Sequence, residues 1–104
     1  MLKILVIGDV YGEPGRQAVQ AIVPGFRKDE GVNLVICNGE NAAQGNGITE
    51  RTAKELFDAG CDILTLGDHV FDRKNEVEQI FAKDKRLVRP ANFPKGVPGE
   101  GSLV

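Results

Sequence analysis

The stretch Leu34-Val35-Ile36-Cys37-Asn38-Gly39-Glu40-Asn41 decides how this chain folds. It begins with an apolar run that does not alternate, stops at Asn-Gly, and continues with a carboxylate and a carboxamide. Such a run is typical of a strand buried on both faces of a parallel sheet. Because ligands bind parallel sheets just beyond the carboxyl ends of the strands, Glu40 and Asn41 are predicted to lie at a functional edge.

The same pattern occurs twice more, since Leu2-Lys3-Ile4-Leu5-Val6-Ile7 precedes Gly8-Asp9, and Asp62-Ile63-Leu64-Thr65-Leu66 precedes Gly67-Asp68-His69. A single Asp after a strand can simply cap the next helix. Polar endings on three neighbouring strands favour a metal site instead, because carboxylate and carbonyl oxygens are the ligands of hard metal ions.

The positions of these polar side chains suggest a role for each in a two-metal hydrolytic centre, which needs a carboxylate that bridges both ions. Glu40 follows the middle one of the three apolar runs and is the predicted bridge. Asp9 and Asn41 would complete one ion, and Asp68 would bind the other. His69 is the only histidine and would reach over the substrate, although an ordinary surface histidine is the simpler interpretation.

Helical patterns separate the apolar runs. An apolar stripe predicts a first helix with Pro14 at its first position, and a kink or an early stop at Pro24. Thr49 is the predicted N-cap of a second helix that extends through Ala59. Residues on one face of each of the three helices are predicted to be buried: Val19, Ile22, Val23 and Phe26; Ala53, Leu56 and Phe57; Val77, Ile80 and Phe81.

The order of these elements predicts an α/β fold, a parallel-sheet sandwich with flanking helices, in one domain over residues 1–104. Leu87-Val88-Arg89-Pro90 is predicted to be a short edge strand, and Leu103-Val104 to open another. The loop over residues 42–47 contains two glycines and is interpreted equally well as a flexible connection or as a backbone that a substrate approaches closely.

Composition excludes several classes of protein. The chain has 13 basic and 15 acidic residues, so no strong nucleic-acid surface is expected. No apolar run approaches the ~18 residues of a membrane span. Cys37 and Cys61 form no C-x-x-C pair and are expected to be reduced and buried in a cytoplasmic protein. The glycines after the first strand lack the G-x-G-x-x-G spacing, which argues against a dinucleotide cofactor.

Four strings resemble the bacterial YmdB-type, calcineurin-like metallophosphoesterases: Gly8-Asp9-Val10, Asn38-Gly39-Glu40-Asn41-Ala42-Ala43, Leu66-Gly67-Asp68-His69 and Arg89-Pro90-Ala91-Asn92-Phe93-Pro94. The resemblance implies a dinuclear phosphodiesterase acting on 2′,3′-cyclic nucleotides. It implies that Asp9 and Asn41 bind the first ion, that Glu40 bridges, that position 68 binds the second ion and that His69 donates a proton. Iron or manganese is the expected metal, with magnesium as a further option.

Two departures from the family qualify this expectation. The family has Gly-Asn-His where this chain has Gly67-Asp68-His69. Its members are also more than twice as long, and their later half supplies histidine ligands, so this chain resembles the N-terminal part and should be inactive alone. It would then associate with itself or with a complementing C-terminal half. The competing hypothesis is a non-catalytic α/β module that binds a metal ion or a phosphate.

Overall fold

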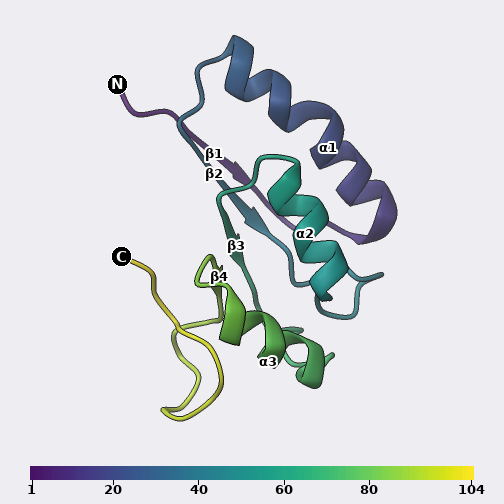
Figure 1. Ribbon diagram of the computed structural model, residues 1–104, viewed down its shortest axis with the longest axis vertical. Coiled ribbons are helices and arrows are strands. Elements are labelled where there is room, and N and C mark those ends of the chain that lie inside the picture. The colour runs from purple at the N-terminus through teal and green to yellow at the C-terminus, as the bar shows by residue number, and fades with distance from the viewer.

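The computed structural model describes all 104 residues as an α/β fold built on one parallel sheet. Strands and helices alternate along the chain in this order: β1 (Ile4–Ile7), α1 (Gly12–Asp29), β2 (Leu34–Asn38), α2 (Glu50–Asp58), β3 (Ile63–Thr65), α3 (Lys74–Lys83) and β4 (Leu87–Val88). The strands lie side by side in the order β1-β2-β3-β4 (Figure 1). This confirms the predicted fold class and the short edge strand.

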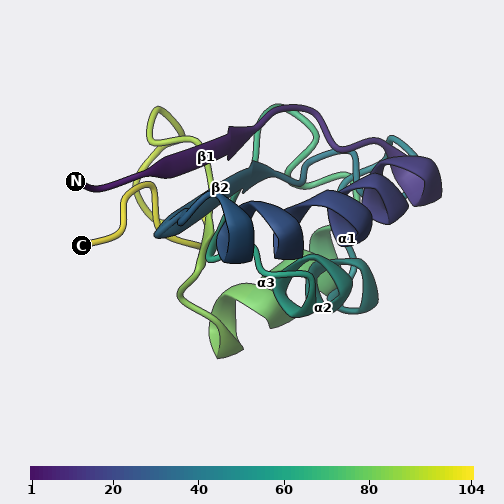
Figure 2. The same ribbon diagram turned by 90° about the horizontal axis from the view of Figure 1, so that it is seen from above.

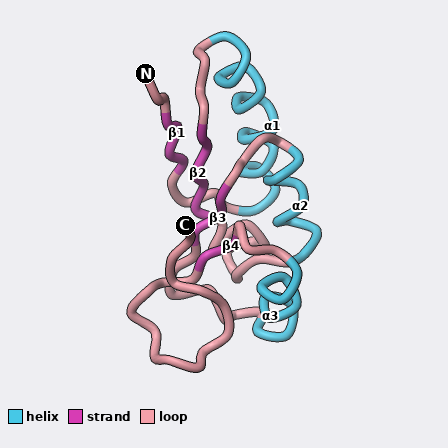
Figure 3. The backbone as a smooth tube through the Cα atoms, turned by 60° about the vertical axis from the view of Figure 1, so that its left-hand side comes forward, coloured by secondary structure: helices cyan, strands magenta, loops and turns pink.

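All three helices cover the same face of the sheet (Figure 2, Figure 3). α1 packs beside α2, and α2 packs beside α3. The core lies between these helices and the inward-facing residues of the strands, among them Val35, Cys37 and Leu64, each of which is fully buried. Both cysteines are unpaired and buried, as predicted.

The prediction that the strands are buried on both faces is wrong for β1. Ile4 is 48% exposed and Val6 is 69% exposed, whereas Leu5 and Ile7 pack against the core. No helix covers the second face of the sheet, so an apolar strand there buries only alternate side chains. β2 is better covered, with buried residues alternating with partly buried ones.

Helix α1 differs from its prediction in three respects. It begins at Gly12, so Pro14 lies in its first turn rather than at its first position. It continues past Pro24 to Asp29, because Pro24 is exposed and water can bond the carbonyl that the proline leaves unpaired. Ile22 and Phe26 are 46% and 39% exposed, so the buried face consists of Gly12, Arg16, Val19 and Val23.

Helices α2 and α3 agree with their predictions. The Thr49 side chain accepts a hydrogen bond from the Thr52 backbone, and the Thr52 side chain bonds back to the Thr49 backbone, which makes a capping box. Ala53 and Leu56 are buried. Val77, Ile80 and Phe81 are the buried residues of α3, and Phe57 is partly buried against the core.

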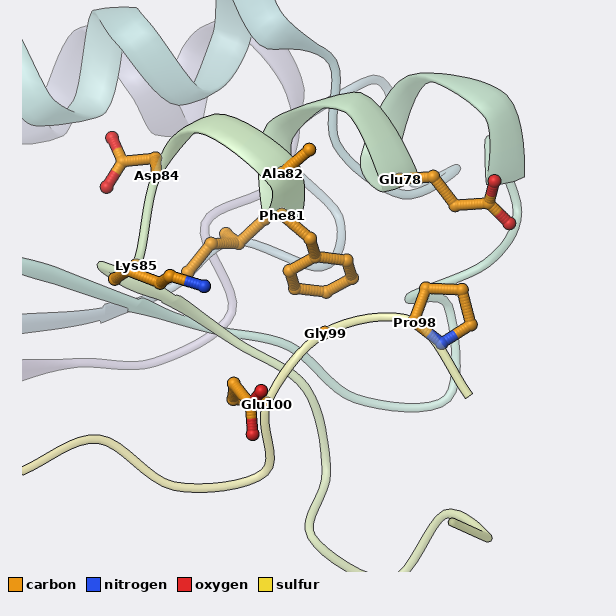
Figure 4. Close-up of a pocket in the computed structure, with 9 residues that line it drawn as sticks. Glu78, Phe81, Ala82, Asp84, Lys85, Pro98, Gly99 and Glu100 are labelled. Carbon is orange, nitrogen blue, oxygen red and sulfur yellow. The ribbon is translucent and has the colours of Figure 1, made fainter. Parts of the chain in front are cut away.

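The segment after β4 packs on the sheet edge but adds no strand. Val88 forms an isolated bridge with Glu100, and Gly99 lies directly against the Phe81 ring (Figure 4). Leu103 and Val104 are exposed and unpaired, so the strand predicted there is not formed. No helix of the chain is long and apolar enough to cross a membrane.

Leu56 gives a test of the core between α2 and the sheet. It is fully buried, so Leu56→Ala should lower the free energy of unfolding by about 2–5 kcal/mol through lost contacts and a residual cavity. Lys54→Ala on the exposed face of the same helix should change it by less than about 0.5 kcal/mol. Urea denaturation followed by circular dichroism measures both, and equal losses would contradict the burial of Leu56.

Candidate metal centre

The parallel register brings the polar strand ends to one edge of the sheet. Cys37 pairs with Ile7 on one side and with Leu64 on the other, so the residues that follow β1, β2 and β3 leave the sheet together. The backbone N–H of Val10 donates to the Asn38 carbonyl at 3.2 Å, and that of Gly39 donates to the Thr65 carbonyl at 2.9 Å. These bonds tie the loop after β1 to the end of β2 and the loop after β2 to the end of β3.

Asp9 and Asn41, predicted to share one ion, are in direct contact. The Asn41 side-chain amide donates to Asp9 Oδ1 at 2.6 Å. Asp9 has a positive φ of 43°, a left-handed conformation that Asp adopts more readily than most residues. Gly12 donates its backbone N–H to the Asn41 carbonyl at 3.0 Å, so the start of α1 holds the same loop.

The carboxylate of Glu40, the predicted bridge, lies against the turn that follows β3. Its Oε2 accepts the backbone N–H of His69 at 3.2 Å, and its Oε1 accepts the Asn38 amide at 3.3 Å. A side chain at position 67 would collide with it, because a Cβ added to Gly67 would overlap both carboxylate oxygens. The absence of a side chain at Gly67 therefore permits the carboxylate to reach this position.

Asp68 and His69 lie beside Glu40, but the His69 ring is held by a different carboxylate. His69 Nδ1 lies 2.7 Å from Asp72 Oδ2, in an i,i+3 pair on the turn before α3. The hydrogen bond to Asp72 raises the pKa of His69, partial desolvation opposes this, and the charges of Asp68 and Glu40 raise the pKa further. The protonated imidazole is therefore favoured in this environment.

The structure brings the predicted ligands together in pairs rather than as one cluster. No three His, Cys, Asp or Glu side chains converge closely enough to hold a metal ion between them. Hydrogen bonds to neutral groups occupy the carboxylates of Asp9 and Glu40 instead.

The residues nevertheless fit hard metal ions by the chemistry of their donors. Three carboxylates and one carboxamide meet at this edge, and oxygen ligands of this kind suit magnesium, manganese and ferrous ions. The space that Gly67 leaves for Glu40 supports this fit, since it brings the central carboxylate against the Asp68 turn.

The loop over residues 42–47, for which two interpretations were open, is closed by its own backbone hydrogen bonds. Gly45 donates to the Asn41 carbonyl at 2.9 Å, and Ala43 donates to the Gly47 carbonyl at 3.0 Å. Gln44 has a positive φ of 60°, and the Tyr11 ring lies directly over Gly45, where a Cβ could not fit. These bonds and contacts favour an ordered turn over a flexible connection.

Sequence reasoning missed three residues at this edge. Asn38 bonds the Glu40 carboxylate, Asp72 bonds His69, and Arg16 bonds the carbonyl of Ala42. The i,i+3 spacing of His69 and Asp72 could have indicated their contact. Arg16 lies three residues before Val19, on the face of α1 that the apolar pattern predicts to be buried, and a charge there was a signal.

A pocket of about 250 Å³ lies between α3, β4 and the C-terminal segment (Figure 4). Phe81, Ala82 and Leu87 contribute its apolar lining. None of the predicted site residues lines it, so it is separate from the strand ends.

Comparison with known proteins identifies the family. A sequence profile described as "YmdB-like protein" matches residues 5–104. The chain belongs to this family. It is 45% identical over 100 residues to the 2′,3′-cyclic-nucleotide 2′-phosphodiesterase of Bacillus subtilis strain 168.

Two crystal structures share the YmdB-like fold of this chain. A hypothetical protein from Thermus thermophilus superposes with a TM-score of 0.86 at 44% identity over 94% of this chain. A novel phosphatase from Mycoplasma pneumoniae superposes with a TM-score of 0.89 at 32% identity over 98% of this chain. The chain spans 38% of the Bacillus protein and 37% of each of these two structures, so it corresponds to a part of each relative.

The contact between His69 and Asp72 gives a test in the metal-free chain. Asp72→Asn should lower the pKa of His69, because the hydrogen bond to Asp72 is the largest cause of its elevation. Asp68→Asn should lower it less, since Asp68 acts through charge alone. Proton NMR of the imidazole between pH 5 and 9 measures both values.

The raised pKa of His69 determines how the stability of the fold should depend on pH. Stability from the protonated His69 should be fully present below about pH 6.5, the unfolded value, and lost as the pH rises through the folded value. An unchanged His69 titration in Asp72→Asn would show that the contact does not persist in solution.

Proposed function

We propose that this chain supplies about half of a dinuclear metal site in a phosphodiesterase that acts on small phosphodiesters such as 2′,3′-cyclic nucleotides. The supporting observation is the convergence of three strand ends, which places Asp9 against Asn41 and Glu40 against the Asp68-His69 turn. The name of the Bacillus relative supports the substrate class. The share of that relative that the chain spans supports a half-site.

Asp9 and Asn41 would hold one ion, Glu40 would bridge, and Asp68 would hold the second ion. Manganese or iron suits this oxygen set once imidazoles from elsewhere join it, and magnesium suits the oxygens alone. Bound ions would supply a water nucleophile of lowered pKa and would offset the negative charge that develops on the phosphate.

His69 would donate the proton that the leaving oxygen needs. Its Nδ1 lies against Asp72, so Nε2 would be the ring nitrogen that donates to the substrate. Its raised pKa keeps the imidazole protonated closer to neutral pH, where a general acid must still carry its proton. Asp72 would therefore orient the donor and maintain its charge.

The uncovered face of the sheet would take part in completing the protein. Ile4 and Val6 are exposed on the face that no helix covers. Apolar surface of this kind would favour association with a complementing half or with a second copy of the chain.

A second candidate function is a non-catalytic module that binds a single metal ion or a phosphate. The separation of the carboxylates into pairs favours it, because no preformed two-ion cluster is present among the chain's own side chains. The two functions differ in metal stoichiometry and in turnover.

Metal content tests the bridging role of Glu40. Glu40→Ala should lower bound Mn²⁺ more than Asp9→Ala, because losing a bridge releases both ions whereas losing Asp9 releases mainly one. Asp58→Ala removes an exposed carboxylate at the C-terminal end of α2, which leads to the start of β3 rather than to its end, and should leave the metal content unchanged. Elemental analysis after dialysis against Mn²⁺ gives the ratios, and equal content in wild type and Glu40→Ala would refute the bridge.

Turnover tests the half-site. With excess Mn²⁺, the chain alone should not hydrolyse a 2′,3′-cyclic nucleotide or a generic phosphodiester. Half of the ligands would not fix the spacing of two ions, and a misplacement of ~1 Å can cost about 10²-fold in rate. A chimera that joins this chain to the unmatched part of the Bacillus relative should hydrolyse them, and His69→Ala should slow the chimera by about 10²–10⁴-fold.

Equal turnover by the lone chain and the chimera would show that the half-site proposal is wrong. An inactive chimera that is folded and loaded with metal would instead favour the non-catalytic module.

A further inference from the structure

Arg16 is the only charged residue of the chain that is buried. It is 5% exposed, and it lies on the face of α1 that packs towards the core. A buried guanidinium is costly unless its donors are paired, and apolar residues of similar volume often stabilise a core as well or better. Its position therefore needs an explanation beyond the stability of the fold.

The guanidinium of Arg16 links two segments that are far apart in the sequence. Its Nη1 donates to the backbone carbonyl of Ala42 at 2.6 Å, and its Nε forms an ion pair with Glu55 of α2. Glu55 also meets Arg51 at 3.4 Å on the exposed side. The ion pair between Arg16 and Glu55 thus fixes the direction of the guanidinium, which contacts α2 through Nε and the Ala42 peptide through Nη1.

Ala42 directly follows Glu40 and Asn41 in the chain. The Asn41 carbonyl accepts the backbone N–H groups of Gly12 and Gly45 at 3.0 and 2.9 Å. Two residues of α1 therefore bond two consecutive carbonyls of this loop: Gly12 bonds the carbonyl of Asn41, and Arg16 bonds the carbonyl of Ala42. Because α1 begins shortly after Asp9, these bonds connect the backbone next to Glu40 and Asn41 with the segment that carries Asp9.

We propose that Arg16 is a positioning residue that sets the place of Glu40 and Asn41 relative to Asp9, with Glu55 holding its guanidinium in the required direction. The proposal rests on the function proposed above for the metal ligands, but the contact itself can be tested without metal. Lysine cannot replace it, because a single ammonium cannot reach Glu55 and the Ala42 carbonyl with the fixed fork of a guanidinium.

Arg27 offers a matched control on the same helix. Its Nε and Nη2 donate to the Gly60 carbonyl at 3.0 and 2.8 Å, and its Nη2 pairs with Asp62. It therefore makes the same kinds of contact as Arg16, with a carbonyl and a carboxylate. Its contacts lie before β3, at the opposite end of the sheet from the metal ligands.

Amide hydrogen exchange tests positioning in the metal-free protein. In Arg16→Lys, exchange at Gly12 and Gly45 should be about tenfold faster than in wild type, because the Ala42 peptide is released and the bonds to the Asn41 carbonyl open more often. In Arg27→Lys these two amides should exchange at the wild-type rate. Unchanged exchange in a folded Arg16→Lys protein would overturn the proposal.

Manganese affinity tests the consequence for the ligands. Arg16→Lys should weaken Mn²⁺ binding by about 10–100-fold, the usual effect of losing a group that orients a ligand, while Arg27→Lys should stay within about twofold. Titration followed by the electron paramagnetic resonance of free Mn²⁺, at a temperature where circular dichroism shows every variant folded, gives the affinities. Equal weakening by both variants would show only a general structural role and would overturn the proposal.

Glu55→Gln provides a second variant if Arg16→Lys does not fold. The glutamine keeps an oxygen that can accept from Arg16 but has no charge. Amide exchange should therefore become faster and Mn²⁺ affinity weaker, as in Arg16→Lys, but by smaller factors. Unchanged exchange and affinity in Glu55→Gln would then overturn the proposal. If exchange responds as expected but wild type binds no Mn²⁺, the positioning contact is confirmed and the proposed metal function fails instead.

Discussion

The backbone at Asn38 and Gly39 is the constraint on which both the core and the candidate site depend. The Asn38 carbonyl accepts a bond from the loop after β1, and the Gly39 N–H donates to the end of β3. A Cβ on Gly39 would lie 3.2 Å from Ile48 and 3.6 Å from Leu56, so this dipeptide also rests on the core. Because Glu40 follows at once, its carboxylate is placed by core packing as much as by polar contacts.

The two faces of the sheet make different contributions. The helix-covered face holds the core and, through Arg16, the loop that carries Asn41. The other face leaves Ile4 and Val6 exposed, and the C-terminal segment covers only the part near β4. The candidate site lies at the edge of the sheet between these two faces.

The sequence was sufficient for the parallel sheet and for the polar strand ends that lie along one edge of it, because both follow from local pattern. Apolar runs that end at Gly or Asn-Gly predicted the parallel strands, and the register then brought Asp9 and Asn41 into contact. The exposure of Ile22 and Phe26 could not be predicted, because a stripe on a helix does not reveal which of its residues face the sheet. The roles of Arg16 and Asp72 depend on contacts between side chains that no apolar pattern specifies.

The candidate site gathers a left-handed residue and several negative charges at one edge of the sheet. Asp9 has a left-handed backbone, and the carboxylates of Asp9, Glu40, Asp68 and Asp72 gather at one edge with His69 as the nearby titratable base. Strain and like charge at one place are tolerated only where surrounding structure enforces them. Here the enforcing structure is the backbone bonding at Asn38, Gly39 and Asn41. In the function proposed above, a cation bound at this edge would offset part of this negative charge, and its binding would stabilise the folded chain.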